Sequence, residues 1–266
     1  RYFYITYMKS IQQNIKNLKV NGITTIKNVL SAKQCNLYTK YCNEVFQKLL
    51  KKKRTHSFNK NCQWVQSPFR FDSNFFNLIY FKNVDKILSK LLGIDYTITN
   101  TTIFNRRILN HKNISGLDMG DTWHTDSRYL DGRRLDKGFG YLVLLMFEDF
   151  TKENGATKYV PKSHLLRSIP PKNQKKYKYK LITGKKGTMV IIDTGIWHKG
   201  GAATTQSRWS LFNFYSPWFI KPYYQYEKMI GKTKFKTLNK KVKKILHYNS
   251  TPPLHDDIRV STVTRI

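Results

Sequence analysis

The segment Trp123-His124-Thr125-Asp126 contains two candidate metal ligands, and the fold and the chemistry of this sequence are predicted outward from it. In an extended strand, successive side chains point to opposite faces, so His124 and Asp126 at positions i and i+2 point to the same face and can bind one ion together. A third ligand has to come from elsewhere in the chain. His198 is the natural candidate, because it follows residues 187–197, whose composition predicts a buried strand and then a turn.

Two imidazoles and one carboxylate on one face form the facial triad of non-heme Fe(II) oxygenases, which leaves coordination positions open for a chelating cosubstrate and dioxygen. A His-x-Asp pair alone is weak evidence. With His198 as the third ligand, the pair meets the ligand count of an iron site, and Arg208 follows ten residues further on. Zn(II) could bind the same side chains and activate water, but no obvious general base accompanies them and Arg208 has no purpose in that scheme.

The segments around these ligands predict a mostly β fold. Residues 94–104 follow an extended, largely alternating pattern, and residues 141–147 are apolar throughout, as in a strand buried on both faces. Short strands separated by Gly and Asn turns, without alternating helices, indicate a sandwich or jelly roll. We expect one domain, with a helical N-terminal part at about 1–93, a jelly-roll core at about 94–220 and a C-terminal extension at about 221–266.

Helices are predicted before the strand-rich half. The first twenty residues have mixed helical character, and a short alternating strand follows at 22–30. Ser31 as N-cap with Gln34 three residues later forms a capping box, and the apolar residues that follow repeat with a helical period. Asn83 is expected to cap a second, shorter helix. Residues 55–75 look irregular.

Three segments carry a resemblance to a known family. They are His124-x-Asp126, the segment Asn-Gly-Ala-Thr-x-x-Val-Pro-x-Ser-His at 154–164, and Trp-His-x-Gly-Gly-Ala at 197–202 followed by Arg208. Together they resemble the phytanoyl-CoA dioxygenase family of Fe(II)/2-oxoglutarate oxygenases, and the likeness extends over nearly the whole chain. It implies a double-stranded β-helix core (jelly roll, cupin-like) with flanking N-terminal α-helices, and an iron site. It also implies that 2-oxoglutarate is decarboxylated to succinate while O2 oxidises a substrate C–H bond.

The resemblance also assigns roles to residues around the metal. The remote carboxylate of 2-oxoglutarate needs a cation, and the guanidinium of Arg208 offers a bidentate match. Ser210, at i+2 on the same strand, can donate a further hydrogen bond. Asn105 corresponds to a polar position that contacts the cosubstrate, and Tyr141 is a candidate for the pocket wall, with a core tyrosine as the alternative. Asp126 predicts a hydroxylase, because halogenating relatives carry a small residue there.

The formal net charge of +32 is the strongest anomaly of composition. Basic stretches at 51–54, 172–180 and 232–244 would suit a nucleic-acid-binding protein on a jelly-roll scaffold, the main alternative function. No groove-reading motif accompanies them, so we favour a lysine-rich solvated surface. A zinc-type or catalytically silent relative is the remaining alternative. Arginines at 106–107 and 128–134 predict a small-molecule substrate that is polar or anionic.

The sequence offers no membrane or disulfide signature. It has no run of eighteen apolar residues, and its first residues lack the apolar core and cleavage site of a signal peptide. The three cysteines form no Cys-x-x-Cys pair, which argues against a disulfide framework and a cysteine zinc site. We therefore expect a cytoplasmic enzyme with no membrane partner.

Overall fold

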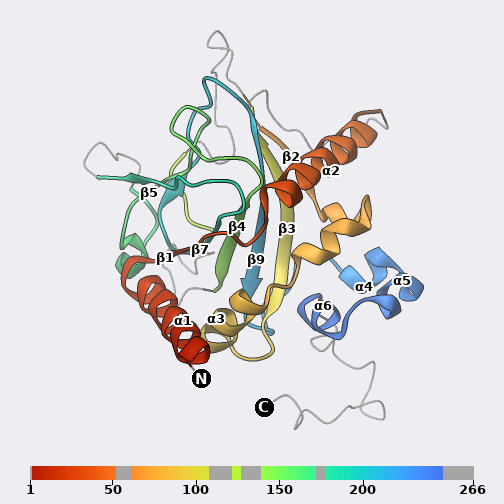
Figure 1. Cartoon of the computed structure of the whole chain (residues 1–266), viewed down its shortest axis with the longest axis horizontal. Coiled ribbons are helices and arrows are strands. Elements are labelled where there is room, and N and C mark those ends of the chain that lie inside the picture. The colour runs from red at the N-terminus through yellow and green to blue at the C-terminus, as the bar shows by residue number, and fades with distance from the viewer. Residues whose placement is uncertain (1, 52–61, 108–121, 127–138, 172–177, 248–266) are drawn as a thin grey trace.

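The computed structural model describes residues 2–51, 62–107, 122–126, 139–171 and 178–247 (Figure 1). Within them a six-stranded antiparallel sheet lies at the centre. In spatial order its strands are β1 (Ile23–Ile26), β7 (Met189–Asp193), β4 (Tyr141–Met146), β9 (Arg208–Ser216), β3 (Thr97–Arg106) and β2 (Cys62–Gln66). A smaller sheet has the order β6 (Lys180–Leu181), β5 (Lys158–Tyr159) and β8 (His198–Lys199).

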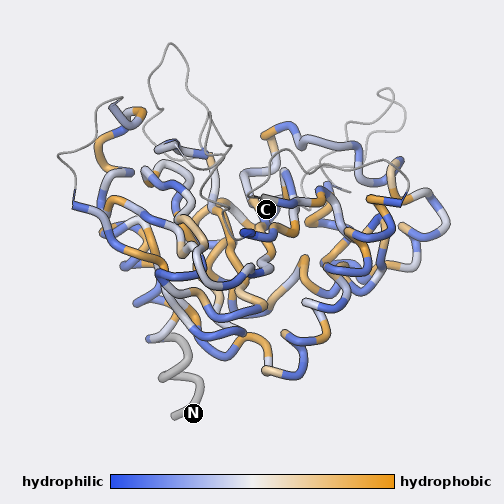
Figure 2. The backbone as a smooth tube through the Cα atoms, turned by 90° about the horizontal axis from the view of Figure 1, so that it is seen from above, coloured by the Kyte–Doolittle hydropathy of each residue, from blue (hydrophilic) through white to orange (hydrophobic). Residues whose placement is uncertain are grey.

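Strand β4 shows why the central sheet is buried on both faces. Its alternate residues Val143 and Leu145 belong to the larger hydrophobic core, whereas Leu142 and Leu144 belong to a second, smaller one. Helices pack on the side of the larger core, and the smaller core lies on the opposite face. Figure 2 shows hydrophobic segments of the backbone in the middle of the molecule, with many hydrophilic segments around them.

Helices flank the central sheet at both ends of the chain (Figure 1). The N-terminal helices are α1 (Tyr2–Asn21), α2 (Ala32–Lys51) and α3 (Lys82–Leu92), and the C-terminal ones are α4 (Tyr226–Ile230), α5 (Lys232–Thr237) and α6 (Lys240–Ile245). The predicted β core with flanking N-terminal helices is confirmed. The three C-terminal helices were not predicted from the sequence. Among the described residues, no helix is both long enough and apolar enough to cross a membrane.

The start of α2 confirms the predicted capping box. The Ser31 backbone N–H donates to the Gln34 side-chain oxygen at 2.9 Å, and the Gln34 N–H donates to the Ser31 hydroxyl oxygen at 3.2 Å. The predicted cap of the next helix is wrong. α3 begins at Lys82, two residues earlier than Asn83 as N-cap would place it; Phe81 occupies the N-cap position without a side-chain hydrogen bond, and Asn83 lies inside the first turn.

Residues 62–75, the described part of the segment expected to be irregular, are more regular than their sequence suggests. The described part of this segment contains β2 and two 3-10 turns, Pro68–Arg70 and Ser73–Leu78. β2 pairs with β3 from Cys62↔Arg106 to Gln66↔Thr102 and forms the edge of the central sheet. The extended pattern predicted from residue 94 begins only at Thr97, since Ile94 is 59% exposed and precedes the strand.

Candidate metal centre

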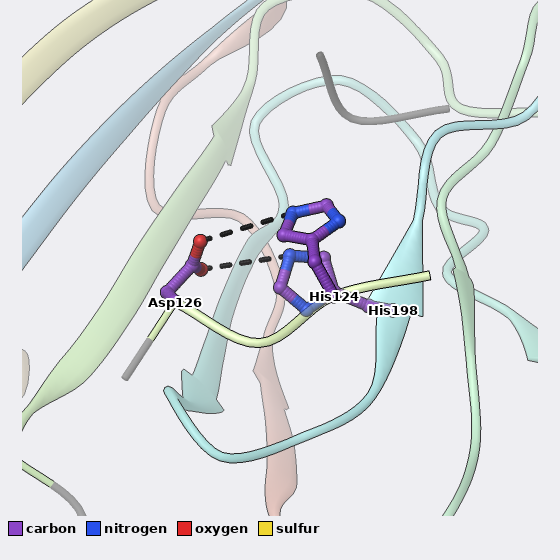
Figure 3. Close-up of side chains that lie close together, drawn as sticks. All are labelled: His124, Asp126 and His198. Atoms are coloured by element: carbon purple, nitrogen blue, oxygen red, sulfur yellow. Dashed lines mark ion pairs between the residues drawn. The ribbon is translucent and has the colours of Figure 1, made fainter. Parts of the chain in front are cut away.

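The three predicted metal ligands lie together in the folded chain (Figure 3). His124 Nε2 is 3.9 Å from Asp126 Oδ1, and His198 Nε2 is 3.5 Å from Asp126 Oδ2. One ligand atom from each side chain lies within 4.8 Å of the other two. Ligand atoms about 2 Å from a metal are roughly 3 Å apart, so a small closure of these side chains would complete a coordination shell.

The backbone holds the two histidines directly opposite each other. An isolated antiparallel bridge joins them, in which the His124 N–H donates to the His198 carbonyl at 3.0 Å and the His198 N–H donates to the His124 carbonyl at 2.9 Å. Their ring centroids are 4.3 Å apart. One pair of backbone hydrogen bonds therefore brings together two ligands that lie far apart in the sequence.

Hydrogen bonds also fix which nitrogen of each ring can bind metal. His124 Nδ1 lies 2.8 Å from the Thr122 carbonyl oxygen, and His198 Nδ1 lies 2.9 Å from the Ile196 carbonyl oxygen. A carbonyl only accepts, so each Nδ1 carries the proton and each Nε2 directs a lone pair toward Asp126. Burial, and next the neighbouring His198, lower the pKa of His124, which favours the neutral ring.

This donor set fits a cation. With both rings neutral, two imidazole lone pairs and a carboxylate face one another, and none of these three acceptor groups can donate a hydrogen bond to another. A divalent metal ion between them would accept an electron pair from each of the three groups. Two histidines and one carboxylate are the ligand set of non-heme Fe(II) oxygenases.

The triad lies in the wall of a cavity of about 550 Å³. Much of the cavity lining is apolar and comes from alternate residues of neighbouring strands: Trp64, Phe104, Leu142, Leu144, Phe212 and Phe214. Trp64 stacks on Phe104 with ring centroids 6.3 Å apart, and Phe104 meets Phe212 edge-on at 5.7 Å. Such a wall can hold an organic substrate and keep water from the metal.

Arg208, the first residue of β9, lines the same cavity and is 2% exposed. Its Nε donates to the Asn154 carbonyl at 3.0 Å and its Nη2 donates to the Gly155 carbonyl at 2.6 Å. The guanidinium carbon lies 3.4 Å from the centroid of the Phe150 ring. The segment at 154–164 thus holds the guanidinium in a fixed orientation, which suits recognition of a carboxylate.

The other predicted cosubstrate residues are less well placed. Ser210 is fully buried on the same strand, and its hydroxyl donates to the Phe104 carbonyl at 3.2 Å. Asn105 donates to the Gln63 side chain at 3.0 Å on the face that points away from the cavity. Tyr141 packs against the larger core. The cavity is lined by their neighbours Phe104 and Leu142, so the contact of Asn105 and Tyr141 with the cosubstrate stays a prediction without support from the cavity lining.

Arg106 is a cavity residue that the sequence did not single out from its neighbours. It ends β3, is 2% exposed and lines the cavity, whereas Arg107 is exposed. The alternation of β3, in which Thr102 and Phe104 also line the cavity, is the signal that could have distinguished it. The arginines at 128–134 lie outside the described residues.

The family model described as phytanoyl-CoA dioxygenase (PhyH) matches residues 18–210, which include the triad and Arg208. The chain belongs to the phytanoyl-CoA dioxygenase family. It is therefore a non-heme Fe/2-oxoglutarate-dependent enzyme, which uses Fe(II), 2-oxoglutarate and O2. No curated protein sequence matches the chain.

Solved structures share the fold of this family member at low sequence identity. The non-heme monooxygenase ThoJ has a TM-score of 0.62 and 17% identity, with 79% of this chain and 80% of that one covered. The α-ketoglutarate-dependent carbocyclase SnoK from nogalamycin biosynthesis has a TM-score of 0.58 and 15% identity, with coverages of 77% and 83%. The epimerase SnoN in complex with Fe3+, α-ketoglutarate and nogalamycin RO has a TM-score of 0.59 and 14% identity, with coverages of 79% and 84%. The predicted cupin-like jelly roll is confirmed.

Proposed function

We propose that this family member is a hydroxylase that acts on a small, polar or anionic molecule and releases succinate and CO2. His124, Asp126 and His198 would hold the iron, and Arg208 would bind the remote carboxylate of 2-oxoglutarate. The observation that carries the proposal is the convergence of two Nε2 lone pairs and one carboxylate in the wall of the cavity that Arg208 also lines. The whole chain would form one catalytic domain.

The residues around the site would have separate roles in this reaction. When bound, Fe(II) and 2-oxoglutarate supply the oxidation of a substrate C–H bond by O2. The Thr122 and Ile196 carbonyls keep both histidine rings in the ligating tautomer, while Asp126 brings a negative charge to the metal. Arg208 neutralises and orients the cosubstrate, and the apolar wall positions the substrate and excludes water.

Hydroxylation is proposed over halogenation because Asp126 occupies the position at which halogenating relatives carry a small residue. Carbocyclisation and epimerisation, the activities named for SnoK and SnoN, occur on the same fold, so the fold alone does not select the reaction. The chain's own carboxylate ligand is what favours oxygen transfer over halide transfer. Incorporation of halide by the wild-type protein would contradict this part of the proposal.

The test is 2-oxoglutarate consumption and succinate release with a panel of small polar molecules. Both should require Fe(II) and disappear in His124→Ala and Asp126→Ala, whereas Glu44→Gln, an exposed carboxylate on α2, should leave them unchanged. Turnover that persists in Asp126→Ala would refute the assignment of the ligand. A nucleic-acid-binding protein would instead show steep salt-dependent binding to DNA or RNA that ignores these substitutions.

A further inference from the structure

Three uncharged polar side chains lie together in the lining of the cavity, on the neighbouring strands β2 and β3 (Figure 1). We call Gln66, Asn100 and Thr102 the amide cluster. Gln66 is the cross-strand partner of Thr102, and Asn100 precedes Thr102 by two positions, so the three side chains share one face of the sheet. Each of them is partly exposed, whereas Thr101 and Ile103 on the other face of β3 are buried. The amide cluster therefore faces the cavity.

The amide cluster uses little of its hydrogen-bonding capacity. Asn100 Nδ2 donates to Thr102 Oγ1 at 3.3 Å, and Asn100 Oδ1 is buried without a hydrogen-bond partner among the described residues. Within the same part of the chain, the Gln66 amide makes no side-chain hydrogen bond and the Thr102 O–H has no acceptor. Unpaired polar groups beside an apolar wall are unfavourable until water or a ligand pairs with them.

An uncharged group that both donates and accepts hydrogen bonds matches this cluster. Gln66 presents an oxygen acceptor and an NH2 donor in one plane, so a carboxamide can form two parallel hydrogen bonds with it. Thr102 Oγ1 already accepts from Asn100, so its proton is left to donate to an oxygen of the ligand. A carboxylate only accepts and would place an oxygen against the Gln66 oxygen. The cluster therefore favours a neutral polar group over a carboxylate.

The position of the amide cluster also separates it from the arginine proposed for 2-oxoglutarate. Arg208 is the register partner of Arg106, which lies four residues beyond Thr102, or about 13 Å along the strand. Next to the cluster, Phe104 and Phe212 line the cavity and meet edge-on with ring centroids 5.7 Å apart. A molecule held by the cluster can place an apolar body on these rings without competing with 2-oxoglutarate for Arg208.

We propose that the amide cluster determines substrate specificity by hydrogen bonding to a carboxamide or hydroxyl group of the substrate, while Phe104 and Phe212 contact its apolar body. The substrate class is a neutral molecule with an apolar or aromatic body and one such polar end. The inference rests on the proposed function, because it takes this cavity as the substrate site. It selects an uncharged polar substrate over an anionic one.

The experiment compares three probes that differ only in their polar end. With Mn(II) and 2-oxoglutarate present, calorimetry measures the binding of 3-phenylpropanamide, of 4-phenylbutan-2-one, in which a methyl group replaces the NH2 group, and of 3-phenylpropionate. Wild type should bind the amide at least about fivefold more tightly than the ketone, because the ketone lacks the donor that pairs with the Gln66 oxygen. It should also bind the amide more tightly than the carboxylate.

A matched pair of variants tests the residue that carries this preference. Gln66→Leu removes the amide at similar size and should bind the amide and ketone probes equally. Gln63→Leu makes the same change on the opposite face of β2, where Gln63 accepts from Asn105, and should keep the preference of wild type. An unchanged preference in Gln66→Leu would overturn the inference. Should that variant not fold, Thr102→Val should weaken binding of both probes, and unchanged affinities would overturn it equally.

Two further measurements separate this inference from the function on which it rests. Binding of Mn(II) and 2-oxoglutarate to wild type is measured first, and if either fails to bind, the proposed function fails. The probes are then compared on the metal-free protein, where the amide preference is still expected because no residue of the cluster belongs to the metal triad. If both bind but wild type prefers the ketone or the carboxylate, only the inference fails. Displacement of the amide probe by 2-oxoglutarate would also overturn it, since the cluster would then belong to the cosubstrate pocket.

Discussion

Replacing Asp126 by Asn should shift stability in opposite directions with and without metal. In the metal-free protein three acceptor groups face one another, with 3.5 Å between His198 Nε2 and Asp126 Oδ2. The asparagine amide could donate to His198 Nε2 and would remove a negative charge from the cluster. One such hydrogen bond contributes about 1 kcal/mol. In a chelator the variant should therefore unfold roughly 2–4 °C above wild type.

Metal should reverse this order. At a Mn(II) concentration of about 100 times its dissociation constant, wild type gains about 2.7 kcal/mol, equivalent to roughly 5–10 °C in melting temperature. Outer-shell partners alone change metal affinity about 10–100-fold, so the loss of a charged ligand should weaken binding by at least about 100-fold. At the same Mn(II) concentration the variant would then gain only about 0.4 kcal/mol.

The assay is thermal unfolding of wild type, Asp126→Asn and Glu44→Gln, each in EDTA and in Mn(II). The surface variant Glu44→Gln should follow wild type in both conditions, because its side chain is exposed on α2. If Mn(II) stabilises Asp126→Asn as much as wild type, the carboxylate is not a ligand. If the variant is less stable than wild type in EDTA, the interpretation of the cluster as three opposed acceptors is wrong.

Three further predictions concern the surroundings of the site. Arg208→Met should weaken 2-oxoglutarate binding by about 10–100-fold in calorimetry without changing Mn(II) affinity, because a charge-assisted bidentate contact is lost; equal cosubstrate affinity would contradict its role. Gly201→Ala should lower the free energy of unfolding by about 1–3 kcal/mol in urea titrations, because the added Cβ would lie 2.4 Å from the Ala156 carbonyl oxygen; an unchanged midpoint would refute this close contact. Burial lowers the pKa of His247 to about 4. Because this folded-state value lies below the unfolded one, stability that is complete above about pH 6.5 should fall by about 3 kcal/mol toward pH 4. His247→Gln, which can still donate to the Ile98 carbonyl, should lose less over that range, and an identical pH profile would contradict the assignment.

The convergence of the three candidate metal ligands could be predicted from the sequence, because the chemistry of an iron site requires side-chain types that a sequence pattern identifies. A His-x-Asp pair on an extended segment places both side chains on one face, and His198 after a buried strand supplies the third ligand. In the structure the antiparallel bridge between His124 and His198 brings these three side chains together, and no additional motif in the sequence marks this bridge. Local signals also predicted the start of α2, since a capping box involves only residues three positions apart.

The wall of the cavity could not be predicted in the same way. β3 and β4 are buried on both faces, so hydrophobicity does not tell which alternate residues face the cavity and which face the helices. A displacement by one residue exchanges the two faces. The sequence pattern alone could therefore not show that Arg106 and Leu142, and not their neighbours Asn105 and Tyr141, line the cavity. Only the pairing of β3 with β9, a contact between distant segments, resolves the choice.

The motif at 154–164 acquires a physical purpose once Arg208 is in place. Asn154 is fully buried, and its side chain donates to the Asp149 carbonyl and accepts from the Thr151 N–H, which closes the turn. Its own carbonyl is then directed at Arg208 Nε, and Gly155, with a φ of +78°, presents the next carbonyl to the same guanidinium. The backbone carbonyls of residues 154 and 155 therefore orient Arg208, although neither residue lines the cavity. A short polar motif in such a place acts on the proposed cosubstrate residue indirectly, through backbone oxygens, without contacting a ligand itself.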